Sequence, residues 1–359
     1  MQVYSDDLIG STIDAVRPLD AEAMAEARAR QDQLTKPRGS LGRLEELSVQ
    51  MAGIRREAMP HFQHKVIVTM AGDHGVVAEG VSAYPQEVTA QMVYNFLRGG
   101  AGISVLAKHI GARVVVVDIG VAATLEPRPG LVSKRVAPGT GNMAKGPAMS
   151  RQQALQAIQA GIEVVEEELR KGLDIVGTGD MGIGNTTPSS AICAVMTREP
   201  VNLVTGRGTG VNDAQLLHKT RVIEESLTVN RPDGRDPLDV LSKVGGFEIG
   251  GLAGVMLGAA AHRVPVVIDG FISGAAALIA TGLCPQLRGY LIASHISVEP
   301  GHQAILRHMG LRPLLDLDMR LGEGTGAALG ISLAEASVKL LAEMATFGEA
   351  GVSDKEGSH

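Results

Sequence analysis

The sequence has little of several residue types, and each shortage excludes a class of protein. Only two cysteines, Cys193 and Cys284, occur in 359 residues. They lie far apart without metal-type spacing, so disulfide bonds and a cysteine zinc site are not expected. Tryptophan is absent, and aromatic residues make up 3% of the chain. The formal net charge is −6, without a long lysine and arginine block, which argues against nucleic acid or an anionic membrane as a partner.

Targeting and membrane segments are lacking as well. The N-terminus, MQVYSDDLIG, has no basic start followed by an apolar run, so no signal peptide is expected and the cytoplasm is the expected location. The most membrane-like segment, residues 264–283, carries Pro265 and Asp269. These interruptions favour a buried strand followed by a helix over a membrane span.

The chain is rich in apolar residues, and these occur in short runs that alternate with longer helical patterns. With 45% apolar and 20% charged residues, it can bury a large core. Short β-branched runs, each before a glycine-rich or polar turn, alternate with longer helical patterns, which predicts an α/β fold with a mostly parallel sheet flanked by helices. The runs are KVIVTM (65–70), RVVVVDIGV (113–121), LDIVGTG (173–179), VNLVTG (201–206), VPVVID (264–269) and GYLIASH (289–295).

The two ends of the chain are expected to form a second, smaller domain. Before residue 60, two helical patterns are joined by the turn-like TKPRGS, and the helix that follows Glu323 is expected to pack with them. The expected organisation is a small helical domain from residues 1–60 and 323–347, a large α/β domain from residues 61–322, and a frayed polar tail from residues 348–359.

The turns that follow the strands are expected to lie along one rim, because parallel sheets bind ligands beyond the carboxyl ends of their strands. In the first of them, AGDHG (71–75), Asp73 and His74 could bind a metal, move a proton or orient other groups. No partner at ligand spacing occurs nearby, so a structural or substrate-orienting role is favoured. The other turns are GTGNMAKGP (139–147), GTGDMGIGNTTP (177–188), GRGTG (206–210), DGFIS (269–273) and SHIS (294–297).

The turn GTGDMGIGNTTP contains a formal GxGxxG at Gly177, Gly179 and Gly182, which suggests a dinucleotide site. Glycine is abundant here, with 45 residues, and Asp180 would put a negative charge near a pyrophosphate. The glycines could also simply permit a tight turn. We favour a third interpretation, in which the next helix begins at Asn185 and binds a single phosphate with its free N–H groups. Further expected contacts to the substrate are Gly182, Gly184, Thr186, Gly208 and Ser297.

Two isolated charged residues remain open to more than one interpretation. Glu323 lies between glycines in LGEGTG, just before a helical pattern. It could be a general base or a helix-start acid favoured by the helix dipole. Lys219, in LLHKTRVI, could lie on a solvated helix face or steady anionic groups of a substrate.

Taken together, several motifs resemble the nicotinate-nucleotide:dimethylbenzimidazole phosphoribosyltransferase family from about residue 20 to about residue 345. In order, they are TKPRGSLGRLE, AGDHGVVAEGVSAYPQEVT, GDMGIGNTTP, LSKVGGFEIGGLAGVMLGAA, DGFIS and RLGEGTGAALG. The resemblance implies a homodimer with a large Rossmann-like domain and a small helical one. It also implies transfer of the phosphoribosyl group of nicotinate mononucleotide to 5,6-dimethylbenzimidazole, which gives α-ribazole 5′-phosphate and nicotinate in building the lower ligand of cobalamin.

The resemblance assigns roles to four residues. The family's catalytic base corresponds to Glu323, and its second catalytic acid corresponds to Asp180, where this chain has aspartate in place of the usual glutamate. The family's lysine corresponds to Lys219. Tyr84 is expected in the base pocket, at a position where other members can have serine, so the preferred azole can differ here.

The chemistry of that reaction supports one carboxylate and no cofactor. Nicotinate leaves as a neutral pyridine, so the leaving group needs neither a general acid nor a metal ion. The incoming azole must lose its N–H proton, and one positioned carboxylate such as Glu323 can accept it. Because aromatic side chains are few, the flat azole is expected to lie against apolar residues such as Met181 and Leu321.

Two other functions remain open at this point. A nicotinamide-dependent dehydrogenase could use the GTGDMG turn, and it would bind a dinucleotide tightly. A non-catalytic protein that binds an azole or a nucleotide would retain its ligand without releasing nicotinate.

Overall fold

The computed structural model describes residues 7–208 and 210–353. At its centre is a six-stranded, entirely parallel sheet of order β3-β2-β1-β4-β5-β6. This is the Rossmann order, and it confirms the α/β fold expected from the sequence. The strands are β1 (Lys65–Gly72), β2 (Arg113–Gly120), β3 (Leu131–Ser133), β4 (Ile175–Met181), β5 (Val266–Ile268) and β6 (Leu291–Ala293).

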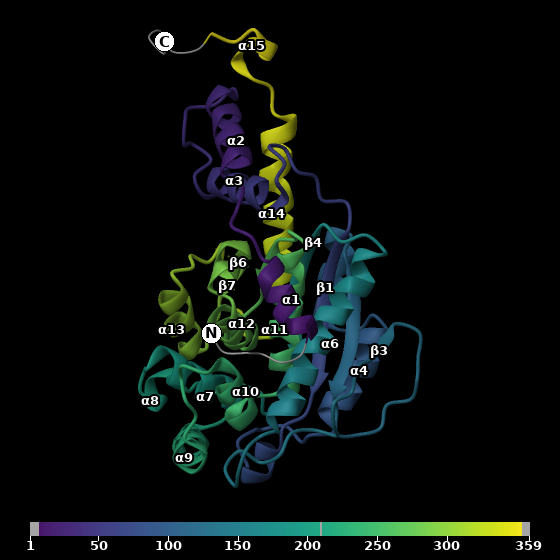
Figure 1. Cartoon of the computed structure of the whole chain (residues 1–359), viewed down its shortest axis with the longest axis vertical. Coiled ribbons are helices and arrows are strands. Elements are labelled where there is room, and N and C mark those ends of the chain that lie inside the picture. Colours follow the sequence, from purple (N-terminus) through teal and green to yellow (C-terminus); the bar gives the residue numbers. More distant parts are fainter. Residues whose placement is uncertain (1–6, 209, 354–359) are drawn as a thin grey trace.

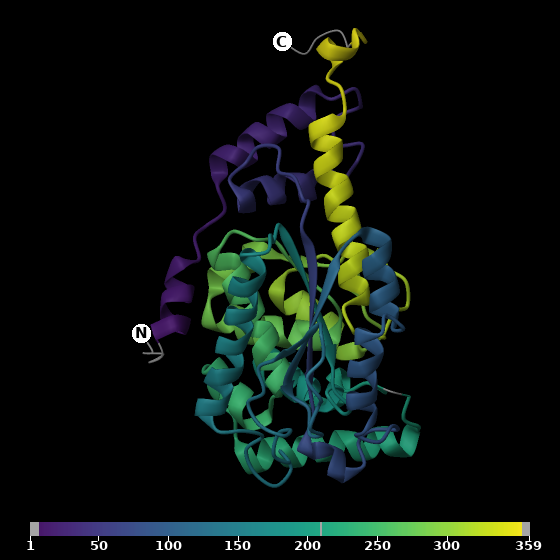
Figure 2. The ribbon, with the colours of Figure 1, turned by 90° about the vertical axis from the view of Figure 1, so that its right-hand side faces the viewer.

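The central strands are continuous apolar runs because helices cover both faces of the sheet. On one face, α11 (Phe247–Ala261) lies along β1, β2 and β4 and packs closely on α6 (Arg151–Leu169). A Cβ added at Gly161 of α6 would lie 1.9 Å from the Gly251 oxygen of α11, so glycine permits this approach. The other face carries α14 (Thr325–Glu343) and α5 (Gly102–Ile110), which lie together on one side of the sheet in Figure 2.

One expected strand is wrong. The run VNLVTG forms the four-residue helix α8 (Val201–Val204), and the neighbour of β4 in the sheet is β5. A central parallel strand needs both faces covered, whereas Leu203 is 58% exposed and only Val204 of the helix is buried. A short apolar run does not by itself distinguish a strand from a helical turn.

The remaining elements connect the strands or follow the last of them. The helices are η1 (Gly75–Glu79), α4 (Val88–Leu97), α7 (Thr186–Thr197), α9 (Asp213–Asn230), α10 (Pro237–Val244), α12 (Phe271–Leu283), η2 (Pro285–Tyr290) and α13 (Pro300–Met309). A separate parallel pair consists of β7 (His295–Ile296) and β8 (Leu315–Asp316).

The N-terminal and C-terminal helices meet beyond the end of the sheet. Figure 1 shows α2 (Ala21–Gln33) and α3 (Arg43–Arg55) beside the outer part of α14. The first helix, α1 (Asp7–Ala15), instead packs on α6 and α11. The division into a large and a small domain therefore stays a proposal. Within the expected tail, α15 (Phe347–Ala350) is helical, and residues 354–359 lie outside the described residues.

Two apolar segments belong to the protein core. Residues 264–283 form β5 and α12, as expected. Helix α14 is long and apolar enough to cross a membrane by length and composition, but 56% of its apolar window is buried inside the protein. It packs against α3, α5 and β4, so it is a helix of the protein core. The cytoplasmic location stays a prediction.

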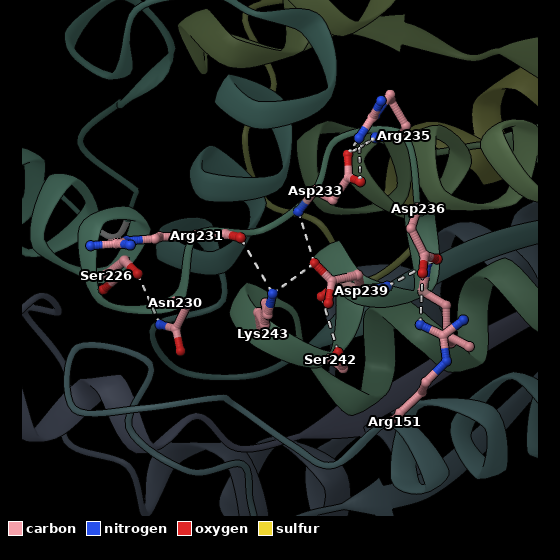
Figure 3. A network of polar contacts seen from close by, with 11 residues as sticks. Arg151, Ser226, Asn230, Arg231, Asp233, Arg235, Asp236, Asp239, Ser242 and Lys243 are labelled. Carbon is pink, nitrogen blue, oxygen red and sulfur yellow. Dashed lines mark hydrogen bonds and ion pairs between the residues drawn. The ribbon is translucent and has the colours of Figure 1, made fainter.

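On the surface, a polar network joins the end of α9 to the starts of α10 and α6 (Figure 3). Asp236 caps α10 through the main-chain N–H of Leu238, at 3.1 Å, and lies 2.8 Å from the Arg151 guanidinium. Lys243 lies 2.9 Å from Asp239, whose carboxylate also accepts the N–H of Asp233 at 2.8 Å. These contacts satisfy the polar groups at helix ends.

Candidate active site

A cavity of about 340 Å³ lies beyond the carboxyl ends of β4, β5 and β6. Among the residues that the sequence predicts for the site, seven line this cavity: Tyr84, Asp180, Asn185, Thr186, Gly208, Ser297 and Leu321. Five do not line it: Met181, Gly182, Gly184, Lys219 and Glu323. Seven further residues line the cavity without having been assigned to the site: Gly270, Phe271, Ile272, His295, Glu299, Arg320 and Gly322. The first four lie in the predicted rim turns DGFIS and SHIS.

Two helices begin at this cavity. Thr186 starts α7, and Phe271 starts α12, so both helix starts lie at the same opening. The first turn of α12 offers free main-chain N–H groups, whereas α7 offers that of Thr186, because the Thr187 N–H donates to the Gly184 oxygen and Pro188 has no N–H. Converging positive dipole ends suit an anion. The motif GNTTP predicts the start of α7. The sequence also predicts a helix after DGFIS at the rim, but it did not assign the start of α12 to the anion.

Lys219 projects from α9 to the start of α7 and is fully buried. Its Nζ donates to the Thr186 hydroxyl at 2.7 Å and to the Gly206 oxygen at 3.3 Å. The interpretation of Lys219 as a solvated helix residue is therefore wrong. Burial lowers the pKa of Lys219 to about 8, while the nearby Glu299 carboxylate opposes that decrease.

Glu299 organises the loop beside Lys219. Its Oε1 accepts the main-chain N–H of Gly208 at 2.8 Å. The buried Oε2 has no hydrogen-bond partner among the described residues. Such an atom in a native fold calls for an explanation, and a hydroxyl or other donor of a substrate would supply one.

Histidines support the rim next to Ser297. His302 is fully buried and accepts the main-chain N–H of Ser297 at Nδ1, at 2.9 Å. Burial, together with the neighbouring His295, lowers the pKa of His302 to about 3, so this imidazole is neutral. Although burial favours neutral His295 as well, the Asp269 carboxylate, 3.7 Å away, raises its pKa overall.

Asp180 is a buried carboxyl group at the end of β4. Its Oδ2 accepts the side-chain N–H of Asn185 at 2.8 Å. Burial raises its pKa well above the ordinary value, and the carboxylates of Asp269 and Glu248 raise it further. These surroundings favour a protonated Asp180, which can donate a hydrogen bond.

The main chain around Glu323 is held in an unusual conformation. Glu323 has a φ of 65° between Gly322 at 77° and Gly324 at 99°, and a non-glycine residue in this region costs on the order of 1 kcal/mol. The Thr69 hydroxyl donates to the Glu323 oxygen at 3.0 Å, and Asp269 accepts the N–H of Gly324 at 3.1 Å. These two buried bonds keep the segment in place.

The Glu323 carboxylate lies at the start of α5. Its Oε2 accepts the main-chain N–H of Ile103 at 3.1 Å, and the side chain is 5% exposed. Burial raises its pKa, and although the Ile103 N–H opposes this, the Asp269 carboxylate adds to the increase. The helix start that this carboxylate contacts is therefore that of α5, and an interaction with the dipole of its own helix α14 stays a prediction. The raised pKa suits a general base near neutral pH.

The formal GxGxxG is not a dinucleotide loop. Gly177 and Gly179 lie inside β4, whereas a dinucleotide fingerprint places its glycines in the strand-to-helix turn. A Cβ added at Gly179 would lie 2.2 Å from the Glu323 oxygen. This glycine therefore allows the main chain of Gly322–Gly324 to pack over the strand.

Asp73 and His74 lie below the cavity and do not line it. Both are 1% exposed, and His74 Nε2 lies 2.9 Å from Glu248 Oε1. Burial favours neutral His74, but the Glu248 carboxylate raises its pKa overall. Among the described residues, no group of three or more histidine, cysteine, aspartate or glutamate side chains is arranged to hold a metal ion.

Comparisons with known proteins place this geometry in a family. A phosphoribosyltransferase family matches residues 16–352. The nicotinate-nucleotide–dimethylbenzimidazole phosphoribosyltransferase of Desulforudis audaxviator is 62% identical over 97% of this chain and 98% of its own length. The enzyme of that name from Roseiflexus sp. is also 62% identical, over 97% and 99%. The crystal structure of CobT from Thermus thermophilus superimposes with a TM-score of 0.90 at 47% identity, covering 93% of this chain and 100% of that one.

Proposed function

The chain belongs to the nicotinate-nucleotide–dimethylbenzimidazole phosphoribosyltransferase family and is an enzyme of cobalamin lower-ligand synthesis, and we propose that its substrates are nicotinate mononucleotide and 5,6-dimethylbenzimidazole. The products are then α-ribazole 5′-phosphate and nicotinate. One observation carries the proposal: a site suited to an anion and a buried carboxylate with a raised pKa occur on the same rim of the sheet.

The phosphate of the nucleotide binds where α7 and α12 begin. The first turn of α12 provides main-chain N–H groups, and the start of α7 provides that of Thr186. Lys219 provides a positive charge behind Thr186. Gly208 and Ser297 line the same part of the cavity. Asp180 and Glu299 then face the ribose, where they can donate to and accept from its hydroxyl groups.

The azole binds beside Tyr84 and Leu321, which are 54% and 60% exposed. Exposed apolar surface in a cavity is the expected receptor for a flat aromatic base. Glu323 does not line the cavity, so the azole must reach past Leu321 to place its N–H against the carboxylate. Glu323 then accepts that proton while the other azole nitrogen attacks the anomeric carbon.

The departure of nicotinate needs no further catalyst. Its ring nitrogen is positively charged in the nucleotide and neutral after the bond breaks, so bond cleavage removes charge and no acid is required. No metal is needed to stabilise the leaving group either. Activity is therefore expected to survive exhaustive treatment with EDTA, and restoration of lost activity by magnesium would contradict this expectation.

The proposed reaction is tested by mixing the enzyme with both substrates and separating the products by chromatography. Nicotinate and α-ribazole 5′-phosphate should appear in equal amounts. No product with any azole or purine would exclude the transferase, and binding of substrates without turnover would favour a non-catalytic binding protein. Tight binding of a nicotinamide dinucleotide would favour the dehydrogenase, which the position of Gly177 and Gly179 inside β4 argues against.

We also propose that the enzyme is a homodimer. Near the cavity, Tyr84, Val298 and Leu321 are apolar and more than half exposed, and such groups on a rim favour coverage by another surface. Light scattering coupled to size-exclusion chromatography measures the mass in solution. A mass of one chain at micromolar concentration would contradict the dimer.

A further inference from the structure

The turn between β4 and α7 carries cavity residues at both of its ends, Asp180 and Asn185. Its middle has no polar side chains to hold it. A Cβ added at Gly182 would lie 2.3 Å from the Gly72 oxygen, and Gly184 has a φ of 87° against the Val77 side chain. The position of this turn therefore depends on its main chain.

One side chain from another segment holds that main chain. The N–H of Ile183 donates to the Thr89 hydroxyl at 3.1 Å. Thr89 is fully buried in the first turn of α4, five residues after Tyr84 in the sequence. A single hydrogen bond thus joins the turn that carries Asp180 to the segment that carries Tyr84.

The Thr89 hydroxyl lies near the buried Asp73 carboxylate. Burial raises the pKa of Asp73, and two groups oppose that increase: the main-chain N–H of Ala122, which Asp73 Oδ2 accepts at 2.8 Å, and the Thr89 hydroxyl. Asp73 follows β1 and Ala122 follows β2, so this carboxylate lies at the ends of two central strands. Because the oxygen of Thr89 accepts from Ile183, its O–H is free to donate, and the Asp73 carboxylate is a suitable acceptor nearby.

A packing role alone does not account for this residue. Valine has nearly the shape of threonine and no polar atom to bury, so it would fill the site at lower desolvation cost. The hydroxyl becomes favourable where it pairs a buried N–H that would otherwise have no partner. At position 89 that N–H belongs to the turn beneath the cavity.

We propose that Thr89 is a positioning residue for the azole. Its hydroxyl joins the turn 180–185, which carries the proposed ribose contact Asp180, to the segment of Tyr84, and so sets the position of the azole relative to the ribose. The proposal rests on the proposed function for the identity of the azole. The hydrogen bond between Thr89 and Ile183 is independent of that function.

Two substitutions separate hydrogen bonding from packing. Thr89→Val keeps the shape and removes the bond, whereas Thr89→Ser keeps the hydroxyl and removes the methyl group. We expect Thr89→Val to lower kcat/KM for dimethylbenzimidazole on the order of tenfold and to change the ratio of rates for two azoles. Thr89→Ser should retain most of both quantities. Thr12→Val is the matched control, because among the described residues the buried Thr12 hydroxyl bonds to Leu8 within its own helix α1, at 2.7 Å.

Two readouts keep this test separate from the transferase assay. Amide hydrogen exchange at Ile183 should accelerate in Thr89→Val and stay slow in Thr89→Ser. Calorimetric titration with dimethylbenzimidazole should show weaker binding in the valine variant alone. Both remain measurable if the wild-type enzyme forms no product. That outcome would overturn the proposed function but not the hydrogen bond between Thr89 and Ile183. Equal losses in the valine and serine variants, or unchanged azole binding in Thr89→Val, would overturn the proposal.

Discussion

The rim of the sheet and the surface network at the start of α10 hold similar charged groups in opposite ways. In the surface network, Asp233, Asp236 and Asp239 pair with arginine, lysine and helix-end N–H groups, and most of these partners lie close in sequence (Figure 3). At the rim, the buried Oε2 of Glu299 has no hydrogen-bond partner among the described residues. The rim also contains the large pKa shifts of Asp180 and Lys219.

This difference separates polar groups whose partners are already complete within the protein from groups that are available for chemistry. An exposed ion pair contributes little to the free energy of unfolding, because water screens the charges and the loss of side-chain entropy opposes the pairing. A buried group without a complete set of partners costs stability, and it persists where a substrate completes its environment. The contrast predicts that substitutions change activity most at the rim and least in the surface network.

Glu323→Gln should have the largest effect. The amide keeps the size and most hydrogen bonds of the side chain but cannot accept the azole proton, so turnover should fall about a hundred- to ten-thousand-fold while binding persists. The matched surface change, Asp233→Asn, should leave turnover unchanged. With an N-methylated azole, which has no N–H to lose, wild type and Glu323→Gln should react at similar rates. Near wild-type turnover of Glu323→Gln in single-turnover assays would remove the base from the mechanism.

Lys219→Met should weaken nucleotide binding by roughly ten- to a hundredfold, the range expected for a hydrogen bond to a charged group. Lys219 is protonated below its pKa of about 8 and loses its charge above it. Wild-type affinity should therefore decrease as the pH rises through 8, and the methionine variant should lack this dependence. Calorimetry from about pH 6.5 to about pH 9.5 measures both, with Lys243→Met as the surface control. The same pH dependence in Lys219→Met would assign it to another group.

Tyr84→Ser should change the choice of azole more than the rate with any one azole. Removal of the exposed ring alters the shape of the azole pocket, so the ratio of rates for dimethylbenzimidazole and a smaller or hydroxylated azole should shift by roughly tenfold. The KM for the nucleotide should stay nearly constant. Competition assays with paired azoles measure the ratio, and equal effects on every azole would place Tyr84 outside the pocket.

Arg151→Ala should have the smallest effect. Arg151 is 46% exposed in its pair with Asp236, so the free energy of unfolding should decrease by less than about 1 kcal/mol. Urea denaturation measures this change, and product formation should match wild type. A clear loss of activity would show that the surface network also affects the cavity, and the contrast between the two regions would fail.

Much of the fold could be predicted from local patterns. Five of the six apolar runs are strands, because buried parallel strands leave continuous β-branched sequences. The run at 201–206 failed because its length and composition also fit a helical turn. Within the site, GNTTP predicted the start of α7. Glu299 and Arg320 were not predicted because no motif marks them, and only the tertiary structure brings these two distant segments to one cavity.

The sequence by itself determined the parallel α/β fold, the phosphoribosyltransferase motifs and the isolated carboxylate of LGEGTG. The tertiary structure alone decided the electrostatic state of the candidate groups. It buried Lys219 behind Thr186, placed the N–H of Ile103 against Glu323, and set the carboxylates of Asp269 and Glu248 near Asp180. These effects depend on burial and on neighbours distant in the chain, since a pKa is set by the charges and solvent around a group in space.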